Sequence, residues 1–269
     1  MMKLTILSEN NAIPPFDAEH GLSMLLEYGD KKLLFDTGAG SVLPGNSEKM
    51  NIDLSSVDGV ILSHGHRDHT GGLVHVPPAT VWHSPGITDP HYSHHPGKPV
   101  RTLTMPENCM EHLGKCQCCT VHNFTEIMPG IFLTGPIPRI SGEDCGGPFY
   151  TDQQGTVKDF ISNEQALLLQ EGVLIQGCCH AGIINTLEYC RKIHPEIRVH
   201  TIIGGLHLLL ASEERLKQTA EYLKRSGIET LYLLHCTGDN AVAYLKKSLP
   251  EIKIQTPCVD GIPILLNGI

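Results

Sequence analysis

The stretch that decides the interpretation of this sequence is Val60-Ile-Leu-Ser63 followed by His64-Gly-His66-Arg-Asp68-His69-Thr-Gly-Gly72. Its first part has the composition of a buried strand, and four side chains that can bind a metal ion follow within six residues. Imidazole suits zinc and iron, and a carboxylate adds a harder ligand. The spacing lets His64 and His66 chelate one ion while the glycine-rich turn directs Asp68 and His69 to a neighbouring position. A metal site after a strand is therefore predicted, against the alternative of a polar surface loop.

Two hairpins with the same plan are predicted from apolar runs around short turns. The first joins 22–28 to 31–36 through Gly29-Asp30, and the second joins 165–170 to 173–176 through Glu171-Gly172. In both, the second strand ends in a glycine-containing loop that leads into a helix-like stretch. Two related β-rich halves predict two sheets packed face to face with helices outside.

Helices and strands alternate after residue 180. The predicted elements are a helix over 183–193, a strand over 199–203, a helix that Ser212 caps and that ends at Arg225, a strand over 231–234, a helix over 239–248 and a strand over 252–254. Polar clusters at 177–180, 204–207 and 235–238 follow three strands. Because ligands gather at the carboxyl ends of strands in α/β sheets, we expect these clusters to converge on one site.

Composition narrows the class of partner. The chain of 269 residues carries 20 Lys and Arg against 29 Asp and Glu, a net charge of −9, so no basic surplus exists for a nucleic-acid backbone. No apolar run approaches the roughly 18 residues of a membrane span, and Met1–Asn10 lacks the pattern of a signal peptide. We expect a cytoplasmic protein with reduced thiols and a small-molecule substrate. The sequence does not set its oligomeric state.

The middle of the chain has little periodicity. Within one domain over 1–269, the segment 77–159 is rich in Pro, Gly, His and Cys and is predicted to be a lid or substrate-binding insertion, or else an irregular surface segment. A structural zinc site and mobile-loop contacts with substrate are minor hypotheses for two sets of residues there, Cys109, Cys116, Cys118 and Cys119, and His91, His94 and His95. A phosphate could be bound by Lys98 or Arg139, which are otherwise solvated surface charges.

The motif His-x-His-x-Asp-His resembles the signature of the metallo-β-lactamase superfamily, and Phe35-Asp36-Thr37-Gly38 resembles its upstream Asp-Gly motif. The resemblance extends over nearly the whole chain. It implies an α/β fold of the four-layer αββα metallo-β-lactamase sandwich type, with a site for one or two metals at the sheet edge. Zinc is the expected divalent metal, with iron or manganese as alternatives.

A narrower resemblance is to a branch of metal-dependent hydrolases that is named for a 7,8-dihydropterin-6-methyl-4-(β-D-ribofuranosyl)aminobenzene 5′-phosphate synthase. That name implies joining a dihydropterin diphosphate to an aromatic ribosyl phosphate with loss of diphosphate. The segments that carry this resemblance are 19–23, 62–66, 177–183, 204–208 and 235–238.

The resemblance also implies metal ligands. His64, His66, Asp68 and His69 match the family motif directly. The wider superfamily has a third His where this chain has Ser162-Asn163-Glu164, and an Asp where it has Gly177-Cys178. His180 is expected to supply the missing imidazole, with Cys178 as a possible soft ligand. His235 is favoured as the last His, and His207 is kept as a ligand or a substrate contact.

These ligands predict a chemistry. A bound metal lowers the pKa of its water toward about 7, so a metal-bound hydroxide would attack a small phosphorylated or ester-containing substrate, pterin- or nucleotide-like. Asp68 would be the catalytic proton acceptor as well as a ligand, and Asp36 would orient the loop or its histidines, or else be a turn carboxylate. Substrate contacts are assigned to His20, His207 and Arg139. The alternatives are the dihydropterin-pathway transferase and a di-iron redox or sensing protein.

Overall fold

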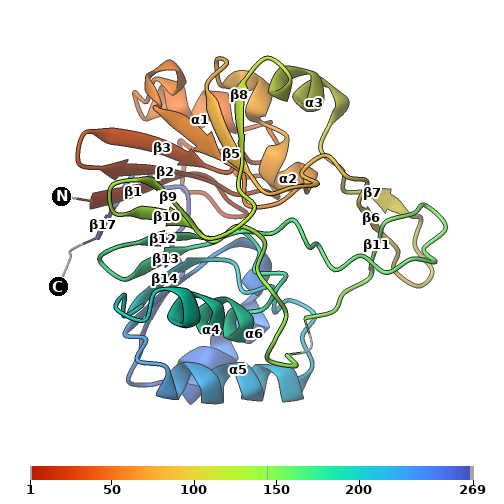
Figure 1. The fold of residues 1–269 in the computed structure, drawn as a ribbon, viewed down its shortest axis with the longest axis vertical. Coiled ribbons are helices and arrows are strands. Elements are labelled where there is room, and N and C mark those ends of the chain that lie inside the picture. The colour runs from red at the N-terminus through yellow and green to blue at the C-terminus, as the bar shows by residue number, and fades with distance from the viewer. Residues whose placement is uncertain (1, 144, 267–269) are drawn as a thin grey trace. The chain divides into compact units, whose positions relative to one another are not determined.

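The computed structural model describes residues 2–143 and 145–266 (Figure 1). Within the described part, the chain forms two compact units. The first unit comprises residues 2–121, 148–163 and 258–266, and the second comprises 122–143, 145–147 and 164–257. Each unit contains one seven-stranded sheet.

The sheet of the first unit has the order β17-β1-β2-β3-β4-β5-β8. Strands β3, β4, β5 and β8 are parallel, and β17, β1, β2 and β3 pair antiparallel. The predicted first hairpin is confirmed, since Leu25 pairs with Leu34 across β2 and β3. The bounds are β1 Met2–Ser8, β2 Ser23–Tyr28, β3 Lys31–Phe35, β4 Gly59–Ile61, β5 Thr80–His83, β8 Gln117–Thr120 and β17 Ile264–Leu266.

Short helices cover this sheet and complete the first unit. Leu43 of α1 and Leu113 of α3 pack in one buried cluster with Leu34, Val60 and Val81 of the strands. A separate three-stranded sheet has the order β11-β6-β7. The bounds are α1 Leu43–Lys49, η1 Leu54–Ser56, α2 Arg67–Thr70, η2 Leu73–His75, β6 Tyr92–Ser93, β7 Arg101–Thr102, α3 Glu107–Leu113 and β11 Phe149–Tyr150.

The sheet of the second unit has the order β16-β15-β14-β13-β12-β10-β9, with β13 to β16 parallel. Helices α4, α5 and α6 flank it (Figure 1). The bounds are β9 Thr125–Met128, β10 Ile131–Leu133, β12 Leu167–Leu169, β13 Val173–Ile175, α4 Ile183–Ile193, β14 Thr201–Gly204, α5 Glu213–Arg225, β15 Thr230–Leu233, η3 His235–Thr237, α6 Asp239–Ser248 and β16 Lys253–Gln255.

The predicted elements of the second unit are confirmed with small shifts of the strand ends. The three helices have the predicted limits, and β12 and β13 form the predicted hairpin. Buried leucines on successive helices, Leu187, Leu223 and Leu245, join the cluster that contains strand residues such as Leu174 and Leu231. Among the described residues, no helix has both the length and the apolar character needed to cross a membrane.

Parallel pairing decides where the polar loops emerge. Ile175, Ile203 and Tyr232 are in register across β13, β14 and β15, so these strands end at the same edge of the second sheet. In the first sheet, β4 lies between β3 and β5, and all three run in the same direction. The His64 loop therefore leaves that sheet at the carboxyl ends of its parallel strands.

The irregular segment 77–159 contributes to both large sheets. Strands β5 and β8 belong to the first sheet, and β9 and β10 belong to the second. These strands have only three or four residues each, which is too short for periodicity to be recognised. The role of 77–159 as a lid or substrate-binding insertion stays a prediction.

The N-terminus of α5 gives a test of local stability. The Ser212 hydroxyl accepts a hydrogen bond from the Arg215 N–H at 3.2 Å, as the cap motif predicts. Ser212→Ala should lower the free energy of unfolding by about 1 kcal/mol, because a helix N–H loses its acceptor. Urea unfolding measures this, with Ser212→Asn as the control that keeps an acceptor. Equal stability of the Ala and Asn variants would contradict the assignment.

Candidate metal centre

The histidine loop of the first unit, residues 64–69, is in contact with a buried carboxylate. Asp36 follows β3 and is fully buried. One of its oxygens accepts from the Ser63 N–H at 2.7 Å, and the other lies 2.6 Å from the Ser63 hydroxyl and 2.7 Å from His69 Nδ1. Asp36 adopts a φ of 56°, in the left-handed region that Asp tolerates better than most residues. Asp36 makes its three contacts with the backbone in this conformation.

These contacts fix the protonation of two imidazoles. An ionised carboxylate only accepts hydrogen bonds, so Ser63 donates its hydroxyl proton to Asp36 and His69 donates from Nδ1. The Ser63 oxygen then accepts from His64 Nδ1, which lies 2.9 Å away. Both His64 and His69 therefore carry their proton on Nδ1 and their lone pair on Nε2. This is the tautomer in which Nε2 binds a metal.

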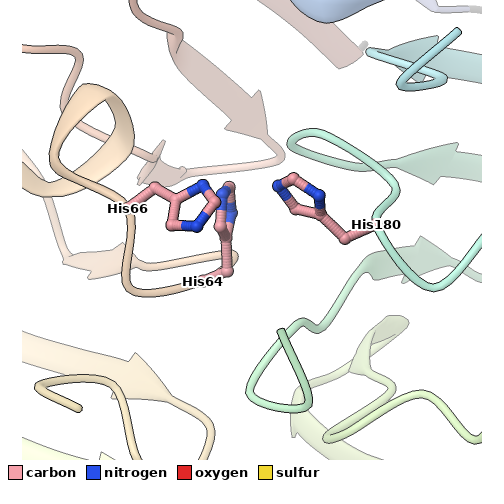
Figure 2. A group of neighbouring side chains, drawn as sticks. All are labelled: His64, His66 and His180. Atoms are coloured by element: carbon pink, nitrogen blue, oxygen red, sulfur yellow. The ribbon is translucent and has the colours of Figure 1, made fainter. Parts of the chain in front are cut away.

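The three histidine rings of the loop lie together. The His64 ring centroid is 4.6 Å from that of His66 and 4.2 Å from that of His69, and all three residues are buried. Figure 2 shows His64 and His66 on the same loop, with their rings side by side. Burial lowers the pKa of His66 to about 3, so this imidazole is neutral, as a metal ligand must be.

Asp68 lies at the edge of the same loop. Its carboxylate is 3.9 Å from His69 Nε2 and 3.4 Å from His20 Nε2. The Asp68 side chain is 14% exposed and the His20 side chain 69% exposed, whereas His69 is fully buried. Asp68 is therefore the most exposed of the four candidate ligands in the loop, and His20 is a surface neighbour of it.

The polar clusters at the ends of β13, β14 and β15 converge in the second unit, as the sequence predicts. The Cys178 sulfur and one ring nitrogen each of His180 and His207 all lie within 4.8 Å of one another. The ring centroids of His180 and His207 are 4.3 Å apart. Cys178, His235 and Cys236 form a second such group. We call these five residues the strand-end cluster, and His64, His66, Asp68 and His69 the loop cluster.

Cys236 is a candidate ligand that the sequence reasoning missed, although it follows His235 directly. Burial raises the pKa of its thiol, but hydrogen bonds with Cys178 and His207, and the charges of His207 and His235, hold that pKa well below its usual value. Thiolate is the form of cysteine that binds metals. Adjacent residues in the 235–238 segment therefore present an imidazole and a sulfur as candidate donors.

Glu164 holds the backbone of the strand-end cluster through hydrogen bonds at His180 and Ala181. Its two oxygens accept the N–H groups of His180 and Ala181, each at 2.6 Å. Burial raises the pKa of Glu164 to about 7, although these hydrogen bonds and the charge of Arg139 oppose the rise. Glu164 stands in the segment where the resemblance implies a third His. Its contact is with backbone groups, which leave no signal in the sequence.

The remaining predicted residues are more dispersed. Arg139 is exposed on the loop after β10, and Lys98 is exposed near the small sheet. Three cysteines of the middle segment, Cys109, Cys116 and Cys118, each donate to a different backbone carbonyl. Within the described ranges, no metal-competent group includes them or Cys119. No disulfide joins any of the ten cysteines.

Comparisons with known proteins identify the family. A model of the metallo-beta-lactamase superfamily matches residues 17–109. The uncharacterized protein MJ0448 of Methanocaldococcus jannaschii is 30% identical over 248 residues, which cover 91% of this chain and 94% of the relative. The solved structure of Tm1679, described as a metal-dependent hydrolase of the beta-lactamase superfamily, is 31% identical, covers 99% of both chains and has a TM-score of 0.84. This chain belongs to the metallo-beta-lactamase superfamily.

Membership of the metallo-beta-lactamase superfamily confirms two predictions, the fold and the class of metal-dependent hydrolase. The narrower resemblance is supported by a second protein of M. jannaschii, named 7,8-dihydropterin-6-methyl-4-(beta-D-ribofuranosyl)-aminobenzene-5'-phosphate synthase. It is 30% identical over 265 residues, which cover 89% of each chain.

The role of Asp36 can be measured by metal titration of the metal-free protein. Asp36→Asn keeps the shape and the tolerance of positive φ but loses the charge that holds Ser63 and His69. Metal affinity should fall roughly 10- to 100-fold, the usual effect of removing a carboxylate behind a ligating histidine. The exposed Asp58→Asn is the matched control. An unchanged affinity in Asp36→Asn would refute the orienting role.

Proposed function

We propose that this protein hydrolyses a small phosphorylated or ester-containing molecule, pterin- or nucleotide-like, with one or two divalent metal ions bound by its histidine clusters. The observation that carries this proposal is the contact set of Asp36, which gives His64 and His69 the tautomer of metal ligands. Residues that only filled a core would have no need of a shared buried carboxylate.

The donors fit such ions. The loop cluster offers three imidazoles and one carboxylate, and the strand-end cluster offers imidazoles together with thiols. Imidazole and thiolate donors suit zinc, which is the proposed metal, and also iron, while manganese would prefer more oxygen donors. The proposed ligands are His64, His66, Asp68, His69, His180 and His235, with Cys178 and His207 as further donors.

A bound divalent ion would supply a water of lowered pKa and would polarise an ester or phosphoryl oxygen. The residues of the chain have separate tasks. Asp68, which solvent reaches, is the proposed proton acceptor. His20, 3.4 Å from Asp68, is a proposed substrate contact. Arg139 is a second such contact, because an anionic substrate needs a local cation in a chain with a net charge of −9.

Metal removal tests this proposal. Dialysis against a chelator should abolish turnover of generic phosphodiesters, esters or thioesters, and zinc should restore it. A metal-free preparation with full activity would exclude a metal-dependent reaction. Elemental analysis of the same samples distinguishes zinc from iron, and zinc alone would remove the di-iron redox alternative.

The expectation that each cluster supplies metal ligands is tested by substitution of one histidine in each. His64→Ala and His180→Ala should each lower both the metal bound per chain and the turnover, because each removes an imidazole ligand. The exposed His122→Ala is the control. If His180→Ala retained the metal content and turnover of the unmodified protein, the strand-end cluster would have no part in the reaction.

A second candidate function is the transfer reaction that the name of the synthase relative suggests. In it, a dihydropterin diphosphate would be joined to an aromatic ribosyl phosphate, and diphosphate would leave. Incubation with both compounds should then give the coupled product and one diphosphate per product. Hydrolysis of the diphosphate ester without coupling would favour the hydrolase.

A further inference from the structure

His91 is a buried histidine whose two ring nitrogens are both engaged. Its Nδ1 lies 2.5 Å from an oxygen of Asp159, and its Nε2 lies 3.1 Å from the side-chain nitrogen of Asn163. The side chains of His91 and Asp159 are 4% and 7% exposed. All three residues belong to the first unit, although His91 and Asp159 are 68 positions apart in the sequence.

The hydrogen bonds assign the tautomer of His91. The Asn163 nitrogen also lies 2.7 Å from the Gly86 carbonyl, which can only accept, so this atom is the amide nitrogen and donates to both partners. His91 Nε2 is therefore an acceptor, and Nδ1 donates to Asp159. Burial raises the pKa of Asp159, but hydrogen bonds from His91 and Ile161 hold it below its usual value, so Asp159 is an ionised acceptor.

This arrangement excludes His91 as a metal ligand or a proton donor to substrate. Its Nε2 lone pair accepts from Asn163, and its proton is directed at Asp159. What remains exposed to other groups is the ring surface. A histidine held at both nitrogens has a fixed ring orientation, and it can therefore fix the position of a side chain that packs against it.

The neighbour that His91 supports is His66. The two rings meet edge to face, with centroids 5.1 Å apart and planes at 81°. Gly65, between the two candidate ligands of the loop, allows this approach: a Cβ there would lie 2.9 Å from His91 Nε2 and 2.5 Å from the Ile87 carbonyl. His91 therefore packs directly against the part of the loop that carries His64 and His66.

Backbone hydrogen bonds also connect the histidine loop and His91 to the small three-stranded sheet. The Leu103 N–H, next to β7, donates to the His91 carbonyl, and the Arg67 N–H donates to the Leu103 carbonyl. On the other edge, the Asp159 N–H donates to the carbonyl of Phe149 in β11, whose ring centroid is 5.5 Å from that of His66. His66 is thus enclosed by groups from this sheet and its flanking segments.

We propose that His91, Asp159 and Asn163 form a positioning unit that fixes the ring plane of His66 as a metal ligand. The proposal rests on the proposed function, because it assumes that His66 binds the ion. Asp159 holds the His91 ring by its Nδ1 proton, Asn163 holds the Nε2 side, and the contact between the two rings limits the rotation of His66.

Titration of the metal-free protein with Co(II) tests this proposal, because the visible spectrum of bound Co(II) reports ligand geometry as well as affinity. His91→Ala and Asp159→Asn should each weaken Co(II) binding roughly 10- to 100-fold and alter the spectrum. Because the two residues act as one unit, the double variant should be little weaker than His91→Ala alone. Full additivity of the two effects would overturn the unit.

Two further variants separate positioning from folding. His91→Asn keeps an N–H near the Nδ1 position and should recover part of the affinity, whereas the exposed His122→Ala should bind Co(II) like the unmodified protein. Thermal unfolding identifies any variant that has lost its fold. If His91→Ala does not fold, Asp159→Asn and His91→Asn decide the proposal. Unchanged Co(II) affinity and spectrum in both of these variants would overturn it.

The outcome also separates this proposal from the proposed function. If the unmodified protein binds Co(II) and His91→Ala binds it equally well with the same spectrum, the positioning unit is refuted while the metal-dependent hydrolase stands. If the unmodified protein binds no metal, the proposed function fails. In that case, NMR of the metal-free protein tests whether His91 positions His66. The ring resonances of His66 should shift in His91→Ala, and unchanged resonances would refute the positioning role.

Discussion

The buried carboxylate of Asp36 is the interaction on which the histidine loop depends. A charge with no exposure to water is costly unless hydrogen bonds compensate it, and Asp36 has three donors, from Ser63 N, Ser63 Oγ and His69 Nδ1. Parallel pairing of β3 with β4 brings Asp36, at the end of one strand, beside the loop that follows the next. One carboxylate thereby fixes two imidazoles, one directly and one through a hydroxyl.

The second unit contains a related arrangement with a different contact. Glu164 is also a buried carboxylate beside a histidine loop at the carboxyl end of a parallel strand, but its oxygens accept the backbone N–H groups of His180 and Ala181. Asp36 therefore fixes ring tautomers, whereas Glu164 fixes the path of the chain that carries the ring. Both carboxylates are buried, and each contacts a candidate ligand residue on the side away from solvent.

Backbone strain is concentrated at the same places. Among the described residues, six that are not glycine have a positive φ, and four of these are Asp36, Cys179, His207 and His235. Such conformations cost of order 1–3 kcal/mol each and persist only where surrounding contacts enforce them. Their location at or beside candidate ligands indicates that both units use backbone strain to hold polar side chains at strand ends.

The sequence by itself determined the histidine-rich loop after β4, both hairpins, the limits of α4, α5 and α6, and the placement of polar clusters at the ends of β13, β14 and β15. Periodicity, capping and turns are local, so neighbouring residues suffice to specify them. The sequence suggested an orienting role for Asp36, but only the tertiary structure decided which groups meet: Asp36 meets His69 across 33 positions, Glu164 meets His180 across 16, and His91 meets Asp159 across 68. These pairs exist because strand pairing brings distant loops together, and no local pattern records which of several buried carboxylates a given N–H will reach.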